Sequence, residues 1–333
     1  MPERYRGYKP AIPNTASADA DYRTCPDVTE GDAAGMQALA TSYAVNARRF
    51  IVAMRAADSS AKIGVPWAFS SDVPGAYVPD STEWNNSVLA TDGKDVNFVD
   101  AHYYPFYFSG STGGRNPTDM QVLRSLIKIP SLYGSIRARL NTLNSGASVV
   151  VGETAVSNSP TTVTCTPAGA LFAAGNVLSW LAAGAESVDW WYMNDGGNST
   201  STCVKPGSGF FTSSSPSTPE SPYYGYLLAS LLAQPQAMLG KMATTDPSDV
   251  LAFRAALTTG KHAVALINVN THSSEKVTLQ SEDELSGTLR TWSYSAANQN
   301  SKKSKIIAGT VSASAVASGV WLPAESIVVL ETQ

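Results

Sequence analysis

Charged residues are scarce in this sequence. Asp, Glu, Lys and Arg make up 15% of the 333 residues, against about 25% in typical soluble proteins. The 23 basic and 27 acidic residues give a net charge of −4, and the basic residues form no long run. This pattern argues against nucleic acid or an anionic membrane as the main partner. Hydrophobic residues make up 43%, which is enough for a large core and excludes a disordered chain.

Long apolar runs are also missing. The segment 168–185 is rich in alanine, but Asn176, Ser179 and three glycines interrupt it, so we expect a buried helix rather than a membrane span. Residues 1–8 carry charges and no apolar core, so they are not expected to be a signal peptide. Loops rich in Ser, Thr, Asn and Gly are typical of secreted proteins. We therefore expect a soluble, extracellular protein.

Cysteine and histidine each occur only three times. Cys165 and Cys203 lie in segments rich in Thr and Ser, where a disulfide between loops would fit; the alternative is two free thiols. Cys25 is then either free or paired with sequence outside this chain. The sequence has no Cys and His spacing typical of a metal site, no phosphate-binding glycine loop and no G-x-S-x-G motif. We therefore expect neither a metal nor a cofactor.

Helical and strand-like patterns alternate up to about residue 232. Apolar residues at three- and four-residue steps predict an amphipathic helix over 36–57. Further helices are expected from about residue 84, over 119–143 with an interruption at Pro130, over the alanine-rich segment 167–184 and over 222–232. Short apolar runs predict strands over 62–65, 97–102, 147–152 and 187–192. Strands that alternate with helices indicate parallel βαβ units.

The pattern changes after residue 235, where no helical spacing is found. Strand-like runs cover 250–257, 263–269, 276–279, 288–294 and 327–330, and they predict an all-β sandwich. We therefore predict an α/β domain over residues 1–235 and a C-terminal β-sandwich over residues 236–333. Four parallel strands cannot close into a barrel. Either the sheet is open, or the α/β part is the second half of a larger structure.

The carboxyl ends of the predicted strands carry the candidate functional residues, as in parallel α/β barrels. Glu153 follows the apolar run 149–152, which favours a nucleophile or a proton carrier; the alternative is a structural carboxylate paired with an arginine or capping a loop. Aromatic side chains near the other strand ends suit the faces of sugar rings, and a histidine beside them would bond a sugar hydroxyl or orient Glu153. These candidates are Trp67, His102, Tyr103, Tyr104, Trp190 and Trp191.

The alternative for these aromatic residues is ordinary core packing. At least one of Trp190 and Trp191 must point into the packing between the sheet and the helices. His102 is equally compatible with a structural role.

Four stretches occur in a characteristic order: residues 50–64, 99–105, 150–154 and 188–191. Together they resemble the retaining glycoside hydrolases of the (β/α)8 superfamily with two catalytic glutamates, most closely the family 51, 39 and 79 type, which carries a C-terminal β-sandwich. The resemblance implies that the four predicted strands are strands five to eight of a barrel. It also implies that Glu153 is the nucleophile, that His102 and Tyr104 contact the sugar, and that Trp191 is the aromatic residue after the eighth strand.

The sequence departs from these families at the acid/base residue. They place this glutamate in an Asn-Glu pair after the fourth strand, before the helix matched by 36–57. No Asn-Glu pair occurs there, and neither Glu3 nor Glu30 follows a predicted strand. We therefore expect the first four β/α units and the acid/base residue to lie outside this chain, which as given would have little or no activity.

By this resemblance the intact enzyme would hydrolyse glycosides of polysaccharides or oligosaccharides by double displacement. We expect α-L-arabinofuranosides as substrates, with β-xylosides and β-glucuronides next. Two alternatives stay open: a non-catalytic carbohydrate-binding protein, and a purely structural β-sandwich with a remnant α/β layer.

Overall fold

The computed structural model describes residues 33–68, 81–106, 117–143, 145–157, 161–194, 208–212, 218–279, 285–299 and 306–333. The chain forms two compact units. The first contains residues 1–102 and 135–150, and the second contains residues 103–134 and 151–333. These boundaries differ from residue 235, so the division into segments 1–235 and 236–333 stays a prediction.

A four-stranded sheet has the strand order β1-β2-β3-β4. Its strands are β1 (Gly64–Trp67), β2 (Phe98–Tyr103), β3 (Ser148–Thr154) and β4 (Ser187–Trp190). β1 and β2 pair in parallel, with Gly64 opposite Phe98. Helices lie between successive strands in the sequence, so the predicted mixed α/β architecture with a parallel sheet is confirmed.

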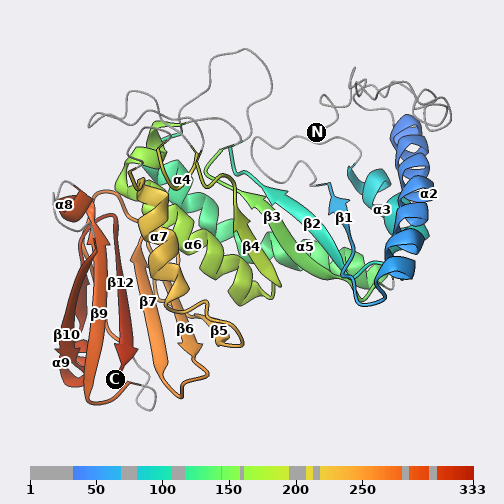
Figure 1. Cartoon of the computed structure of the whole chain (residues 1–333). Helices are drawn as coiled ribbons and strands as arrows, with labels where there is room; N and C mark the ends of the chain where they lie inside the picture. Colours follow the sequence, from blue (N-terminus) through green and yellow to red (C-terminus); the bar gives the residue numbers. More distant parts are fainter. Residues whose placement is uncertain are drawn as a thin grey trace. The chain divides into compact units, whose positions relative to one another are not determined.

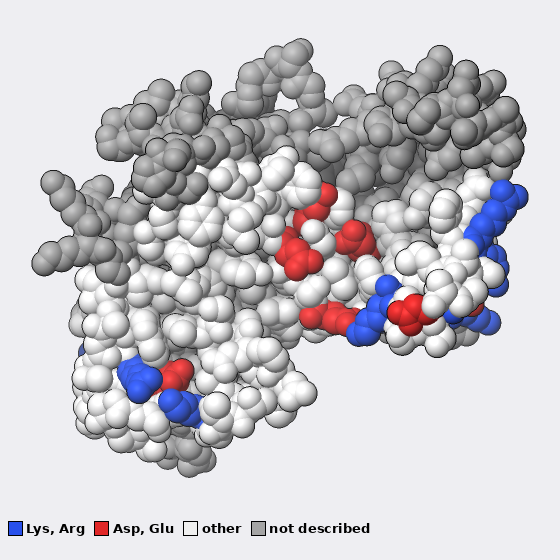
Figure 2. Space-filling model, viewed as in Figure 1, with Lys and Arg blue, Asp and Glu red and all other residues white. Residues whose placement is uncertain are grey.

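The first unit contains the helices α2 (Ala33–Ala57), α3 (Ser81–Asp92) and most of α5 (Ile129–Thr142). Ala40, Ala44 and Ile51 of α2 are buried, because steps of four and seven residues return to the same face of a helix. Arg48 of α2 donates hydrogen bonds to the Asp95 carboxylate at 2.6 Å and to the Thr91 carbonyl at 3.1 Å. Figure 2 shows basic side chains along α2.

The second unit contains α4 (Asp119–Ser125), α6 (Pro167–Ala183) and α7 (Ser221–Ser230). α6 and α7 pack side by side (Figure 1), and residues 167–180 of α6 are all buried. The predicted helix over 119–143 is interrupted by a 3-10 turn, η2 (Leu126–Lys128), rather than at Pro130. Pro130 is instead the second residue of α5, where a helix needs no backbone N–H. A further 3-10 turn, η3 (Thr162–Cys165), precedes α6.

Antiparallel strands follow α7, also in the second unit. A six-stranded sheet has the order β10-β9-β12-β7-β6-β5, and β11 pairs with β8 in a two-stranded sheet. Their bounds are β5 (Met238–Met242), β6 (Val250–Ala256), β7 (His262–Asn268), β8 (Glu275–Val277), β9 (Thr288–Ser295), β10 (Ile307–Ser312), β11 (Val320–Leu322) and β12 (Ser326–Thr332). The expectation of no helix in this region is wrong, because α8 (Ala296–Gln299) and α9 (Ala313–Ala317) are short helices.

A buried apolar cluster forms the core of this antiparallel region. It includes Val250, Leu266, Leu289, Leu322 and Leu330, which come from five different strands. On the face seen in Figure 2, uncharged residues cover most of these strands.

Candidate functional site

Glu153 lies at the carboxyl end of β3, where the alternation of burial along the strand is interrupted. From Ser148 to Val151 buried and partly buried residues alternate, but Gly152 and Glu153 are both partly buried and Thr154 is fully buried. The alternation of burial therefore ends at Gly152, and the last two residues of β3 no longer follow it. Glu153 is thereby kept out of the core, while the next residue is held inside it.

Tyr104 is the direct partner of Glu153. Its hydroxyl donates a hydrogen bond to Oε2 of Glu153 at 2.8 Å, and its ring is 7% exposed. Tyr104 is the residue after β2, so the ends of two strands bring this pair together. A hydrogen bond to a carboxylate favours its charged form and fixes its orientation, and both effects suit a nucleophile.

Trp191 is held beside the same strand end. Its backbone N–H donates to the carbonyl of Thr154 at 2.8 Å, and its ring lies 4.2 Å from that of Tyr192, centroid to centroid. Tyr192 has a left-handed backbone with φ of 77° and is 44% exposed. The structure therefore brings Glu153, Tyr104 and Trp191 to one end of the sheet, with an exposed aromatic ring next to them.

Tyr103 lies in the core instead, and the partly buried Trp190 packs against other aromatic rings. Tyr103 is 1% exposed, its ring meets Trp180 edge-on at 5.4 Å, and burial raises its pKa well above the usual value. Trp190 packs against Phe172 of α6 and stacks on Phe210 at 5.7 Å. These contacts favour core packing, so we assign neither side chain to a sugar-contacting surface.

Two other candidates belong to the first unit. His102 is partly buried, and its Nε2 lies 3.1 Å from the Asp100 carboxylate. Trp67, the last residue of β1, is also partly buried. Because both residues lie in the other compact unit, their participation in a site with Glu153 stays a prediction.

Cys165 is disulfide-bonded. Cys203 and Cys25 both lie outside the described residues, so the pairing of Cys165 with Cys203 stays a prediction.

The sequence analysis did not select two polar residues on the strands β3 and β4. Thr154, the residue after Glu153, is fully buried. On β4, Asp189 is exposed, while the preceding residue, Val188, is buried. Strand alternation could have indicated Asp189, because neighbouring residues of a strand face opposite sides. Burial and the charge of Asp189 together raise the pKa of Tyr226, whose hydroxyl donates to the Val188 carbonyl at 2.9 Å.

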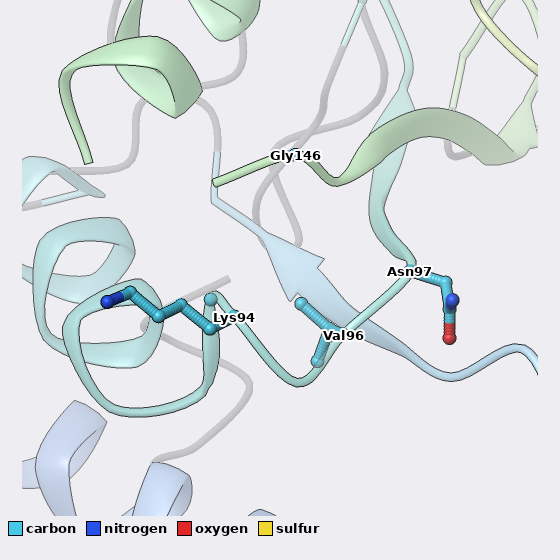
Figure 3. Close-up of a pocket in the computed structure, with 5 residues that line it drawn as sticks. Lys94, Val96, Asn97 and Gly146 are labelled. Carbon is cyan, nitrogen blue, oxygen red and sulfur yellow. The ribbon is translucent and has the colours of Figure 1, made fainter. Parts of the chain in front are cut away.

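A separate hollow of about 440 Å³ lies in the first unit. It is lined by Gly93, Lys94, Val96, Asn97 and Gly146. The side chains of Lys94 and Asn97 point in different directions (Figure 3), and Asn97 accepts hydrogen bonds from Arg55 at 2.8 Å and from the backbone of Ile63 at 3.0 Å. This hollow therefore does not present converging groups to one ligand.

No group of three or more His, Cys, Asp or Glu side chains in the described ranges could hold a metal ion. None of the helices described is both long enough and apolar enough to cross a membrane.

The fold is similar to that of solved glycoside hydrolases. The GH51 arabinofuranosidase from Xanthomonas axonopodis pv. citri superposes with a TM-score of 0.63 and 16% identity, over 88% of this chain and 63% of that one. The α-L-arabinofuranosidase from Thermotoga maritima gives 0.61 and 14%, over 88% and 62%, and the family 44 endoglucanase Cel44A from Clostridium thermocellum gives 0.57 and 11%, over 92% and 62%.

These identities are low, so the likeness shows a glycoside hydrolase fold and not the activity. The chain spans less than two thirds of the length of each of these three structures. No protein family model matches the sequence, and no curated protein is similar to it.

Proposed function

We propose that this chain contributes the nucleophile and part of the sugar-binding surface of a secreted retaining glycoside hydrolase, with Glu153 as the nucleophile. The observation that carries the proposal is the hydrogen bond of 2.8 Å from the Tyr104 hydroxyl to Glu153 at the carboxyl end of β3. The aromatic residues Trp191 and Tyr192 beside this strand end offer the flat apolar surface that a sugar ring requires.

Strands β1 to β4 are proposed to correspond to strands five to eight of a (β/α)8 barrel, and the antiparallel strands to its C-terminal β-sandwich. The strand order β1-β2-β3-β4 supports this, since it follows the chain as in a barrel. The coverage of the solved arabinofuranosidases, 62–63% of their length, is also consistent with a partial barrel.

In the proposed reaction, the Glu153 carboxylate attacks the anomeric carbon, and the bond from that carbon to the leaving oxygen breaks. A second carboxylic acid must protonate the leaving oxygen and later activate water. The expected Asn-Glu pair for this role is not in the sequence, so we assign only the nucleophile to this chain. We propose α-L-arabinofuranosides as the first substrate class, with β-xylosides and β-glucuronides next.

Because the acid/base residue is not assigned to this chain, the experiment uses a leaving group that does not need an acid. A dinitrophenolate leaves without protonation, so the first step with a 2-deoxy-2-fluoro dinitrophenyl glycoside depends on the nucleophile and not on the acid. We expect the arabinofuranosyl reagent to add one sugar to the peptide that contains Glu153, measured by mass spectrometry after digestion. Glu153→Gln should abolish the addition, and Glu186→Gln, at an exposed position before β4, should leave it unchanged.

The proposed function fails if no fluoro-glycoside of the arabinose, xylose or glucuronic acid series labels Glu153. In that case sugar binding, measured by calorimetry on the full chain, separates the remaining candidates. A sugar affinity that survives Glu153→Gln would favour the non-catalytic carbohydrate-binding protein.

A further inference from the structure

Helix α6 carries a buried amide in an otherwise apolar environment. All residues from Pro167 to Trp180 are buried, and Asn176 and Ser179 are the polar ones among them. Asn176 is 0% exposed. Burying an amide costs free energy unless hydrogen bonds compensate, so an asparagine at the centre of this helix requires a structural or functional reason.

The amide nitrogen of Asn176 bonds toward the strand end that carries Glu153, whereas its buried Oδ1 has no hydrogen-bond partner among the described residues. Its Nδ2 donates to the hydroxyl of Thr154 at 3.0 Å, and this hydroxyl donates to the carbonyl of Tyr103 at 2.8 Å. The carbonyl of Thr154 accepts the bond from the Trp191 N–H at 2.8 Å. Thr154 therefore joins α6 to the residues at the ends of three strands.

Each partner in this chain of hydrogen bonds is a site residue or adjoins one. Thr154 shares a peptide group with Glu153, and Tyr103 shares one with Tyr104. Because peptide groups are planar, fixing Thr154 and Tyr103 limits the positions of the Cα atoms of Glu153 and Tyr104. The distance of 2.8 Å between the Tyr104 hydroxyl and Glu153 depends on that restriction.

The burial of Thr154 makes these hydrogen bonds necessary. Thr154 is fully buried, while Gly152 and Glu153 before it are only partly buried. A buried threonine hydroxyl must find partners, and Asn176 and the Tyr103 carbonyl supply them. These bonds therefore hold the residue that directly follows Glu153.

We propose that Asn176 is a positioning residue for Glu153 and acts through Thr154. This inference rests on the proposed role of Glu153 as nucleophile. Asn176 does not touch the substrate; it holds the end of β3 so that Glu153 faces the Tyr104 hydroxyl.

The test uses the full chain with tyrosine labelled by ¹³C at Cζ, because this nucleus responds to the hydrogen bond of the hydroxyl. The Tyr104 signal is identified by its loss in Tyr104→Phe. We expect Thr154→Val and Asn176→Leu, which remove the polar groups at similar volume, to shift the Tyr104 signal toward that of Glu153→Gln. Thr154→Ser, which keeps the hydroxyl, should restore the original signal.

Thr164→Val is the matched control, since Thr164 is also buried and its hydroxyl donates to the Thr161 carbonyl at 2.7 Å. We expect it to lower the melting temperature without moving the Tyr104 signal. The inference is overturned if Thr154→Val and Asn176→Leu leave the Tyr104 signal in place in a folded chain, or if Thr164→Val moves it equally.

If Asn176→Leu does not fold, it is replaced by Asn176→Ala, which also removes the amide, and the same criterion applies. The readout requires no sugar. A shifted Tyr104 signal without any labelling of Glu153 by fluoro-glycosides would therefore overturn the proposed function and leave the positioning role intact. If labelling does occur, Thr154→Val should slow it at least tenfold.

Discussion

At the scale of single residues, the reactivity of the site depends on how Glu153 is held. The Tyr104 hydroxyl contacts one carboxylate oxygen, Oε2, at 2.8 Å. A carboxylate oriented by a fixed donor loses less freedom on reaching the anomeric carbon than a mobile one. The ring of Tyr104 is nearly buried, so packing holds this donor in place and its hydroxyl can be removed without disturbing the ring.

We expect Tyr104→Phe to slow the labelling of Glu153 by the fluoro-arabinofuranoside about 10- to 100-fold. A hydrogen bond to a charged group contributes about 1.5–3 kcal/mol, and a factor of ten corresponds to about 1.4 kcal/mol. The rate is measured by intact mass against time. Tyr133→Phe is the control, because the Tyr133 hydroxyl also bonds a single acceptor, the Gly184 carbonyl at 3.0 Å. An equal effect of both variants would contradict a specific role of Tyr104.

The residue types at the strand ends could be predicted from the sequence, but the direction of each side chain could not. Trp190 and Trp191 are identical neighbours, and only the packing of Trp190 against Phe172 and Phe210 distinguishes them. Tyr103 and Tyr104 are both buried, and they differ in the acceptor of the hydroxyl, which is the Ser125 carbonyl for Tyr103 and Glu153 for Tyr104. Regular alternation of burial along β3 would not predict that Thr154 is buried, so its role could not be predicted from the local sequence.

At the scale of helices and strands, the elements best predicted from the sequence are those with a clear apolar face or a continuous apolar run. Helix 36–57 and the strands over 250–257 and 263–269 were predicted close to their final bounds, because α2, β6 and β7 carry clear apolar patterns. The sequence did not predict β5, β10 and β11. β5 and β10 are the two edge strands of the six-stranded sheet, and none of their residues is buried, so neither carries the apolar alternation that indicates a strand. β11 has only three residues, of which Leu322 alone is buried.

The contact between α6 and α7 also depends on a single glycine. A Cβ atom on Gly225 of α7 would overlap the main-chain carbonyl of Ala170 in α6. We expect Gly225→Ala to lower the free energy of unfolding by at least about 1–3 kcal/mol, because the two helices must separate to admit the methyl group. The measurement is urea denaturation followed by circular dichroism.

Gly134→Ala is the matched control for Gly225→Ala. Gly134 also lies in a helix, α5, but no atom lies within 4 Å of a Cβ added there. Alanine should therefore stabilise the chain by about 0.5–1 kcal/mol through its higher helix propensity. If Gly225→Ala and Gly134→Ala change the free energy of unfolding in the same direction, the close approach of α6 and α7 is contradicted.

At the scale of the whole molecule, the second unit joins helices from the α/β part of the sequence to all the antiparallel strands. Tyr294 of β9 stacks on Tyr224 of α7 at 5.9 Å, and its hydroxyl lies 3.3 Å from that of Ser221. A second connection is a pair of carboxyl groups: Asp119 at the start of α4 is hydrogen-bonded to Glu325 in the turn before β12. The stability of this unit should therefore respond to the protonation of that pair.

Burial, followed by the charge of Asp119 and the hydrogen bond to it, raises the pKa of Glu325 from 4.5 to about 7. Burial also raises the pKa of Asp119, against the lowering effect of its bonds with Thr166 and Glu325; the Thr166 hydroxyl lies 3.1 Å from Oδ1. Between pH 4.5 and about 7 the folded chain thus binds more protons than the unfolded one. The contribution of this pair is fully present below pH 4.5 and is lost as the pH rises through about 7.

We therefore expect the free energy of unfolding to contain a component, on the order of 1–3 kcal/mol, that disappears between pH 4.5 and 8. Glu325→Gln should remove this component, because a neutral amide donates to Asp119 at every pH in the range. The variant should match the wild type near pH 4.5 and exceed it at pH 8, where the two carboxylates of the wild type repel each other. Urea denaturation at four or five pH values measures how the free energy of unfolding changes with pH in the wild type and in Glu325→Gln. An equal pH dependence in the two proteins would show that Asp119 and Glu325 do not share a proton.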